Sequence, residues 1–158
     1  EVPNVSALSN VASGTTSAGA DTTAPAAVSN LATTNPTNTT ITLTWTAPGD
    51  DGSTGTAASY DIRYSTSTIN DANWASATQV TGEPTPAVAG TSQNVVVSGL
   101  NAGTTYYFAM KTSDEVPNVS ALSNVASATT TTTKPRPISP RTANASSPRY
   151  APGRTLHP

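Results

Sequence analysis

The chain has 158 residues, no cysteine and a single histidine, His157, and its 7 basic and 9 acidic residues give a formal net charge of −2. These counts exclude a disulfide framework and a thiolate metal site, and they argue against histidine-based catalysis and any other enzymatic activity. Thr and Ser contribute 30 and 19 residues, and so many β-branched and hydroxyl side chains disfavour long helices and predict an all-β protein.

The N-terminal 16 residues, EVPNVSALSNVASGTT, recur 114 residues later as EVPNVSALSNVASATT, and the only difference is Gly14 against Ala128. A repeat distance of this size is typical of a whole β-sandwich domain and too long for a solenoid unit. We therefore interpret residues 1–16 as the end of a preceding copy of the domain. Local duplication of a single strand is the alternative.

Charge and proline content divide the rest of the chain. Residues 1–130 hold all 9 acidic residues and a net charge of −7, whereas the remainder has 5 basic residues, no acidic residue and 6 of the 13 prolines. Such a tail cannot bury a core of its own. The expected organisation is a last-strand segment copied from a preceding repeat (1–16), a linker (17–23), a sandwich domain (24–130) and a basic Pro/Ser/Thr-rich tail (131–158).

Short apolar alternations separated by turn residues predict seven strands in the domain. The clearest is the run in which Ile41, Leu43 and Trp45 alternate with threonines. The other strands are expected around Val28 and Leu31, Tyr60 to Tyr64, Trp74 to Val80, Val95 and Val97, Tyr106 to Met110, and Leu122 and Val125.

This pattern predicts a seven-stranded antiparallel β-sandwich with extended N- and C-terminal segments. One apolar residue set alternates inward along the expected strands and should form the core. Its members are Ile41, Leu43, Trp45, Tyr60, Ile62, Val95, Val97, Leu100, Tyr106, Phe108 and Met110.

Three motifs at consistent spacing resemble the fibronectin type III domain. They are Trp45 on the second strand, the YDIRY run at residues 60–64 and the LNAGTTY run at residues 100–106. The resemblance covers residues 24–130 and is nearest to Thr-rich bacterial surface versions, whose second strand ends in the WTAPGDDG sequence found here. It implies an immunoglobulin-like topology in which Tyr106 is a tyrosine corner that caps nearby backbone. The Arg-Gly-Asp motif is absent, so no integrin function is expected.

In this topology, loops that share one pole of the sandwich carry Asp50, Asp51, Glu83, Asp114 and Glu115. Carboxylates could bind Ca²⁺ there, and Asp50, Asp51, Asp114 and Glu115 are weak candidates because their spacing is not that of a known calcium loop. A solvated acidic cap with turn-forming aspartates and a polar interface with a neighbouring subunit are the alternatives. No other cofactor or metal is expected.

Two exposed apolar features are candidate interfaces. Val5, Leu8 and Val11 give residues 1–13 the pattern of a last strand without a sheet, and such a strand is expected to complete another subunit or to remain an unpaired stub. Trp74 is expected on an edge strand, where it packs on the sheet, stacks on a sugar or contacts a neighbouring chain.

The basic tail is the third candidate interface. Lys134, Arg136 and Arg141 are expected to dock on the acidic pole of a neighbour, through contacts that are individually weak and sensitive to salt.

Two classes of function remain open. The chain is either an extracellular structural unit of a surface fibre, stalk or tandem array, or an accessory spacer or adhesion module that contacts carbohydrate on a secreted or surface protein. Self-association or contact with neighbouring repeats is expected in the first case. No apolar run approaches the roughly 18 residues of a membrane span, and the acidic domain disfavours nucleic-acid binding.

Overall fold

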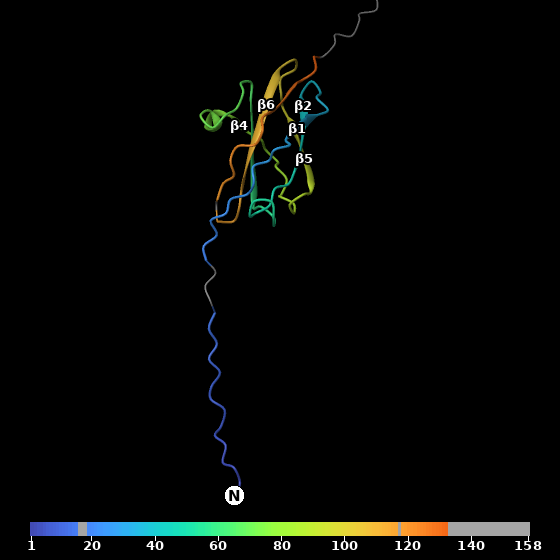
Figure 1. The fold of residues 1–158 in the computed structure, drawn as a ribbon. Helices are drawn as coiled ribbons and strands as arrows, with labels where there is room; N and C mark the ends of the chain where they lie inside the picture. The colour runs from blue at the N-terminus through green and yellow to red at the C-terminus, as the bar shows by residue number, and fades with distance from the viewer. Residues whose placement is uncertain (16–18, 117, 133–158) are drawn as a thin grey trace, which may run out of the picture.

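The computed structural model describes residues 1–15, 19–116 and 118–132, and two antiparallel sheets pack into a sandwich (Figure 1). One sheet has the strand order β1-β2-β5 and the other β4-β3-β6-β7, which confirms the predicted seven-stranded fold. The strands are β1 (Ala32–Thr34), β2 (Thr40–Thr46), β3 (Ser59–Ser65), β4 (Thr78–Gln79), β5 (Ser92–Ser98), β6 (Thr105–Ser113) and β7 (Ala126–Thr129).

The core lies between the two sheets and is built from the alternating apolar residues. All eleven residues predicted to form it are at most 7% exposed. Trp45 on β2 meets Tyr60 on β3 edge to face, with ring centroids 5.3 Å apart. Burial of these rings supplies much of the hydrophobic stabilisation.

Tyr106 forms the expected corner. Its hydroxyl accepts a hydrogen bond from the Asn101 N–H at 3.0 Å, so the ring packs in the core while its oxygen satisfies a loop backbone group. This contact holds the turn that leads into β6.

The strand predicted around Val28 and Leu31 begins later than expected. Both residues are buried, but regular pairing starts at Ala32. Before that point an asparagine side chain replaces the ladder, because Asn30 accepts a hydrogen bond from the Thr46 N–H at 3.1 Å.

The strand predicted from Trp74 to Val80 is largely wrong. Trp74–Ser76 is a short 3-10 helix, η1, and only Thr78–Gln79 pairs with β3. The cause is the preceding turn, in which Asn70 Oδ1 accepts hydrogen bonds from the N–H groups of Ala72 and Asn73. Such asparagine contacts favour turns over extended chain.

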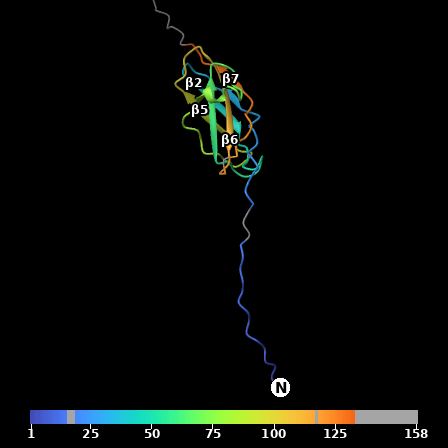
Figure 2. The same ribbon diagram turned by 90° about the vertical axis from the view of Figure 1, so that its left-hand side faces the viewer.

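The chain joins and leaves the sandwich at opposite poles (Figure 2). At the first pole Gly52 N–H donates to Ala24 O at 3.2 Å. At the other pole Thr131 N–H donates to Thr37 O at 2.8 Å. Among the described residues, no helix is long and apolar enough to cross a membrane.

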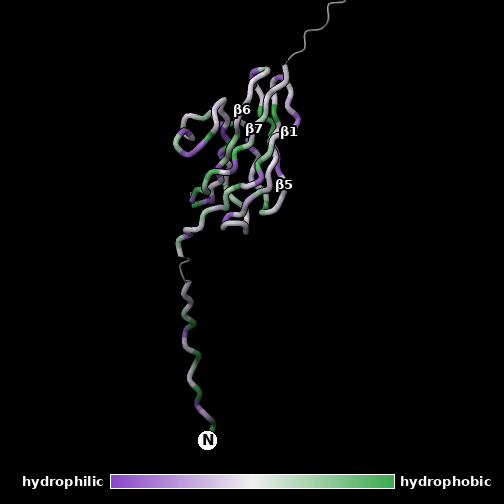
Figure 3. The backbone as a smooth tube through the Cα atoms, turned by 45° about the horizontal axis from the view of Figure 1, so that its top comes forward, coloured by the Kyte–Doolittle hydropathy of each residue, from purple (hydrophilic) through white to green (hydrophobic). Residues whose placement is uncertain are grey.

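Residues 1–15 belong to no strand and are exposed throughout. Figure 3 shows apolar positions recurring along this segment, and its Val5, Leu8 and Val11 side chains are at least 87% exposed. They contrast with the residues of the hydrophobic core, which lie between the two sheets.

Candidate functional site

Three carboxylates gather at the pole where the chain joins the sandwich. Oxygen atoms of Asp21, Asp50 and Glu115 lie within 4.8 Å of one another. Asp50 and Glu115 were predicted here, whereas Asp21 was missed because it lies in the expected linker. The linker must end at the pole where the first strand starts, and this constraint could have placed Asp21 near the other acidic residues.

The other predicted acidic residues point elsewhere. Asp114 is almost fully buried and its carboxylate accepts hydrogen bonds from the Val116 N–H, the Asn118 N–H and the Asn118 amide. Asp51 is exposed, and its carboxylate is not part of the group of three.

The carboxylate of Glu83 is not part of the group of three. Its Oε1 accepts a hydrogen bond from Ile62 N–H at 2.5 Å. The reason is that β4 ends at Gln79 and leaves this N–H of β3 without a ladder partner. Burial raises the pKa of the Glu83 carboxyl.

Crowding of carboxylates has an electrostatic consequence at Asp50. Loss of hydration, followed by the neighbouring Glu115, Asp114 and Asp51, raises the pKa of the Asp50 carboxyl. Its Oδ1 is shielded from solvent and has no hydrogen-bond partner among the residues that the structure describes. The oxygens of Asp50, Glu115 and Asp21 are the type of donor that Ca²⁺ takes, and exposed acidic groups also gather without an ion.

Trp74 packs beneath two cations. The Arg63 guanidinium lies 4.9 Å and the Lys111 ammonium 5.3 Å from the centre of its ring. Arg63 also pairs with Asp61, and Lys111 with Asp71, each at 2.9 Å. These cation–π contacts tie η1 to the outer face of β3 and β6.

The segment that leads into β7 pairs with β6, but its residue spacing differs from that of β6. Its contact residues advance by three positions while those of β6 advance by two, so main-chain atoms alone cannot complete the ladder. The contacting pairs are Ser120 with Thr112, Ser123 with Met110, and Ala126 with Phe108.

Serine hydroxyls close the resulting gaps. Ser123 N–H donates to Met110 O at 3.0 Å, and Ser123 Oγ accepts from Met110 N–H at 2.9 Å. Ser120 makes the same pair of bonds with Thr112, at 2.9 Å each. Each hydroxyl therefore takes the place of a carbonyl in the ladder.

An asparagine connects this segment to the other sheet. Asn124 Oδ1 accepts from Leu31 N–H at 2.9 Å, and Asn124 Nδ2 donates to Leu31 O at 2.8 Å. By contrast Leu122 and Val125, which were predicted to mark the last strand, are only half-buried and precede β7. Hydroxyl and amide groups therefore hold the segment more specifically than its large apolar side chains.

The candidate residues of the tail, Lys134, Arg136 and Arg141, lie outside the described residues. Val5, Leu8 and Val11 are described and lie in the exposed segment 1–15.

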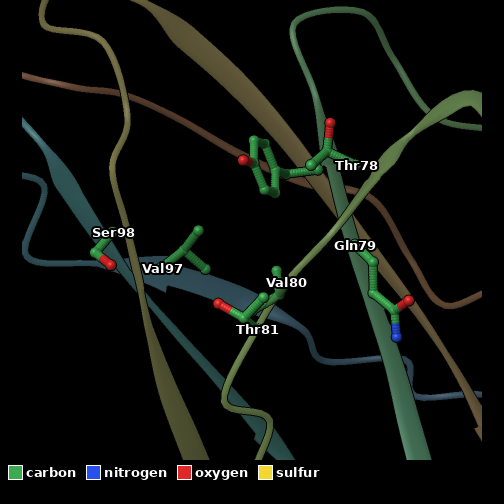
Figure 4. A pocket seen from close by; sticks show the side chains of 7 residues that line it. Thr78, Gln79, Val80, Thr81, Val97 and Ser98 are labelled. Carbon is green, nitrogen blue, oxygen red and sulfur yellow. The ribbon is translucent and has the colours of Figure 1, made fainter.

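A pocket lies between β4 and β5, the edge strands of the two sheets (Figure 4). Its volume is about 210 Å³, below the roughly 300–1,000 Å³ of most ligand sites. The lining consists of Tyr64, Thr78, Gln79, Val80, Thr81, Val97 and Ser98. These side chains offer hydroxyl and amide groups and no carboxylate or cation.

The two-sheet topology, the tyrosine corner and the buried Trp45 define an immunoglobulin-like β-sandwich. The sequence matches the family described as "Fibronectin type III domain" over residues 26–131. The chain therefore belongs to the fibronectin type III family, which confirms the predicted resemblance.

Two curated proteins are similar to the chain. It is 42% identical over 130 residues to "Chitinase A1" of Niallia circulans, a match that covers 80% of this chain and 16% of that protein. It is 34% identical over 131 residues to "Exoglucanase B" of Cellulomonas fimi, covering 82% of this chain and 10% of that protein. The chain thus spans a sixth or less of these relatives.

Among solved structures, the chicken CNTN1 FN1–FN3 domains match with a TM-score of 0.51 and 17% identity, over 68% of this chain and 33% of that one. Domains of titin match with a TM-score of 0.50 and 18% identity, over 68% of this chain and 32% of that one. At this identity the likeness establishes the fold alone.

Proposed function

We propose that the chain is a non-catalytic spacer module of a longer extracellular protein that acts on polysaccharide. A fibronectin type III domain is itself a non-catalytic module. The observation that carries the proposal is that the chain joins the sandwich at one pole, near Ala24, and leaves it at the opposite pole, near Thr131. A domain connected in this way holds its neighbours apart along one line.

The two curated relatives support the extracellular, polysaccharide-related setting. Their names denote a chitinase and an exoglucanase, and the chain matches only a small part of each. Since both are bacterial proteins, a bacterial source is part of the proposal.

A structural array is the second candidate, and the repeated segment favours it. The match between residues 1–16 and 115–130 is closer than two independent spacers need. A surface fibre or stalk built from tandem copies would also connect its domains through opposite poles. The two candidates therefore differ in the kind of protein that contains the domain, and they share the same connection between domains.

Direct carbohydrate binding is the alternative that Trp74 raises. The surroundings of Trp74 weigh against it, because two cations already lie over the ring. Sugar-binding aromatic residues need a ring face that is open to the ligand.

Sedimentation with insoluble chitin and cellulose tests the proposal against this alternative. We expect the wild type and a Trp74→Ala variant to stay in the supernatant equally. Saturable retention of the wild type that the variant loses would replace the spacer with a carbohydrate-contact module.

Spin labels test the spacing itself. Labels at Thr23→Cys and Thr131→Cys should give one narrow distance distribution near 35–45 Å, the length of about 12 extended residues. A broad distribution, or a short distance, would contradict an in-line spacer.

A further inference from the structure

The β7 segment, residues 118–129, comprises β7 and the residues that lead into it. The side chains through which this segment contacts the sandwich occur a second time in the chain. The receiving groups are main-chain atoms of Thr112, Met110 and Leu31, and the groups that dock on them are Ser120, Ser123 and Asn124. Ser6, Ser9 and Asn10 occupy the same places in the N-terminal copy of this segment.

The side chains of the N-terminal copy are uncovered in the structure. Ser6, Ser9 and Asn10 are exposed and lie in no strand. In the β7 segment the two serine counterparts, Ser120 and Ser123, are at most 7% exposed. Docking would therefore bury the hydroxyls against main-chain partners of matching polarity.

Docking would also cover exposed apolar surface. Leu8 and Val11 are 94% and 87% exposed, whereas their counterparts Leu122 and Val125 are half-buried. Removing part of this apolar area from water favours association.

From these observations we propose that residues 1–15 of one chain can serve as the last strand of a second copy, in place of that copy's residues 115–129. This interaction between copies is independent of the spacer role. The second copy supplies the binding groove, and the first supplies a strand that differs from the resident one only at Gly14.

The groove of the same chain is a poor partner because the linker is too short. Thr15 would lie at the far pole, beside Thr105, while Ala24 is held at the first pole by Gly52. Nine residue steps reach at most about 30 Å, roughly the length of β6. The linker would also have to reverse direction twice, for which no length is left.

The resident strand has two advantages over the incoming one. It is tethered beside its groove, which gives it a high effective concentration. It also carries Ala128, which packs against the core cluster, where the incoming strand has Gly14. Exchange is therefore expected mainly when concentrated protein refolds and all strands compete.

Register-specific disulfide formation tests the proposal in the full chain, which has no native cysteine. Thr105 lies directly opposite Thr129, and their hydroxyls are 2.8 Å apart. Since Thr15 is the counterpart of Thr129, a Thr15→Cys/Thr105→Cys variant refolded at high concentration and then oxidised should form covalent dimers.

Three control variants define the specificity. Thr105→Cys/Thr129→Cys should close within the monomer and shows that the geometry permits a disulfide. Ala7→Cys/Thr105→Cys leaves the docking groups intact but is out of register, and it should give at least about tenfold less dimer. Adding Ser6→Ala, Ser9→Ala and Asn10→Ala to the Thr15→Cys/Thr105→Cys variant should lower its dimer yield by a similar factor, because each lost hydrogen bond weakens docking severalfold.

Gly14→Ala in the Thr15→Cys/Thr105→Cys background should raise the yield, because glycine weakens a strand and the alanine restores the resident sequence. Equal yields in the matched and out-of-register variants would overturn the proposal. So would a Thr15–Thr105 disulfide inside the monomer, or no dimer where the Thr105/Thr129 control closes fully.

Discussion

The two tryptophans of the chain occupy opposite environments. Trp45 is 2% exposed and packs between the sheets against Tyr60. Trp74 is half-buried on the outer face, under Arg63 and Lys111. The first contributes through burial of its whole ring, and the second through weaker contacts with charged groups.

Replacing each tryptophan by alanine should separate these contributions. Trp45→Ala should lower the free energy of unfolding by about 3–5 kcal/mol, the cost of truncating a core aromatic residue. Trp74→Ala should lower it by about 1–2 kcal/mol, because cation–π contacts at partly exposed sites are weak. Urea unfolding measures both, and equal losses would contradict the assignment of Trp45 to the core.

Asp50 should make the stability of the domain depend on pH. Its pKa is raised in the folded state above the ordinary value of 3.8, so the folded protein holds this proton more tightly than the unfolded chain. The Asp50 contribution to the free energy of unfolding should therefore increase as pH falls from neutrality through the raised pKa, and level off below 3.8.

Asp50→Asn removes this titration. The variant should be more stable than the wild type at pH 7, and the difference should shrink as pH falls through the raised pKa and level off below 3.8. Urea unfolding at a series of pH values measures the difference. Asp51→Asn is the matched control, and an equal effect of both variants would show that only net charge matters.

At the scale of elements, the pairing of β6 with the segment that leads into β7 relies on side-chain hydroxyls. Ser123 is 7% exposed and satisfies both the N–H and the C=O of Met110. Ser123→Ala should leave the Met110 N–H buried without a partner and cost about 1–3 kcal/mol.

Ser127→Ala on β7 is the control for this substitution, because that side chain is exposed and its loss should change stability by less than about 0.5 kcal/mol. Hydrogen exchange at the Met110 amide should be faster in Ser123→Ala and unchanged in Ser127→Ala. Equal protection in both variants would refute the role assigned to the Ser123 hydroxyl.

The regular strands could be predicted from sequence because their two-residue alternation is unbroken. Ile41, Leu43 and Trp45 each face the core, as the pattern requires. Ser120 and Ser123 could not be predicted in the same way, since they are polar and spaced by three residues. A hydrophobic pattern selects Leu122 and Val125 there, although the structure leaves both half-exposed.

The candidate acidic site was predictable only in part, because topology places the loops but does not place every side chain. Asp50 and Glu115 lie in loops whose pole follows from the topology. Asp21 comes close only because the linker runs past that pole, as its backbone oxygen 3.4 Å from the Asn118 amide shows. The Glu83 carboxylate stays outside the group because it accepts a hydrogen bond from the Ile62 N–H of β3, and assigning a residue to a loop does not reveal such a contact.

At the scale of the whole molecule, the two poles have different chemistry. Carboxylates gather where the chain joins the sandwich, and threonines gather where it leaves, since Thr130 Oγ1 donates to Asn101 O and accepts from Thr104 N–H. In a head-to-tail arrangement the threonine pole of one copy would therefore face the acidic pole of the next.

Residues 1–15 should contribute nothing to the stability of the single domain. They are exposed throughout and belong to no strand, and the sandwich already contains its own copy of their sequence. Deleting them should leave the urea midpoint and the slope of the unfolding transition unchanged, since neither buried area nor hydrogen bonding changes.

Deleting the equivalent resident segment from Ser120 onward should abolish cooperative unfolding, because it removes β7 and uncovers the core. A shift of the midpoint in the first deletion would mean that the N-terminal segment packs on its own domain, and it would contradict the assignment of that segment to a partner copy.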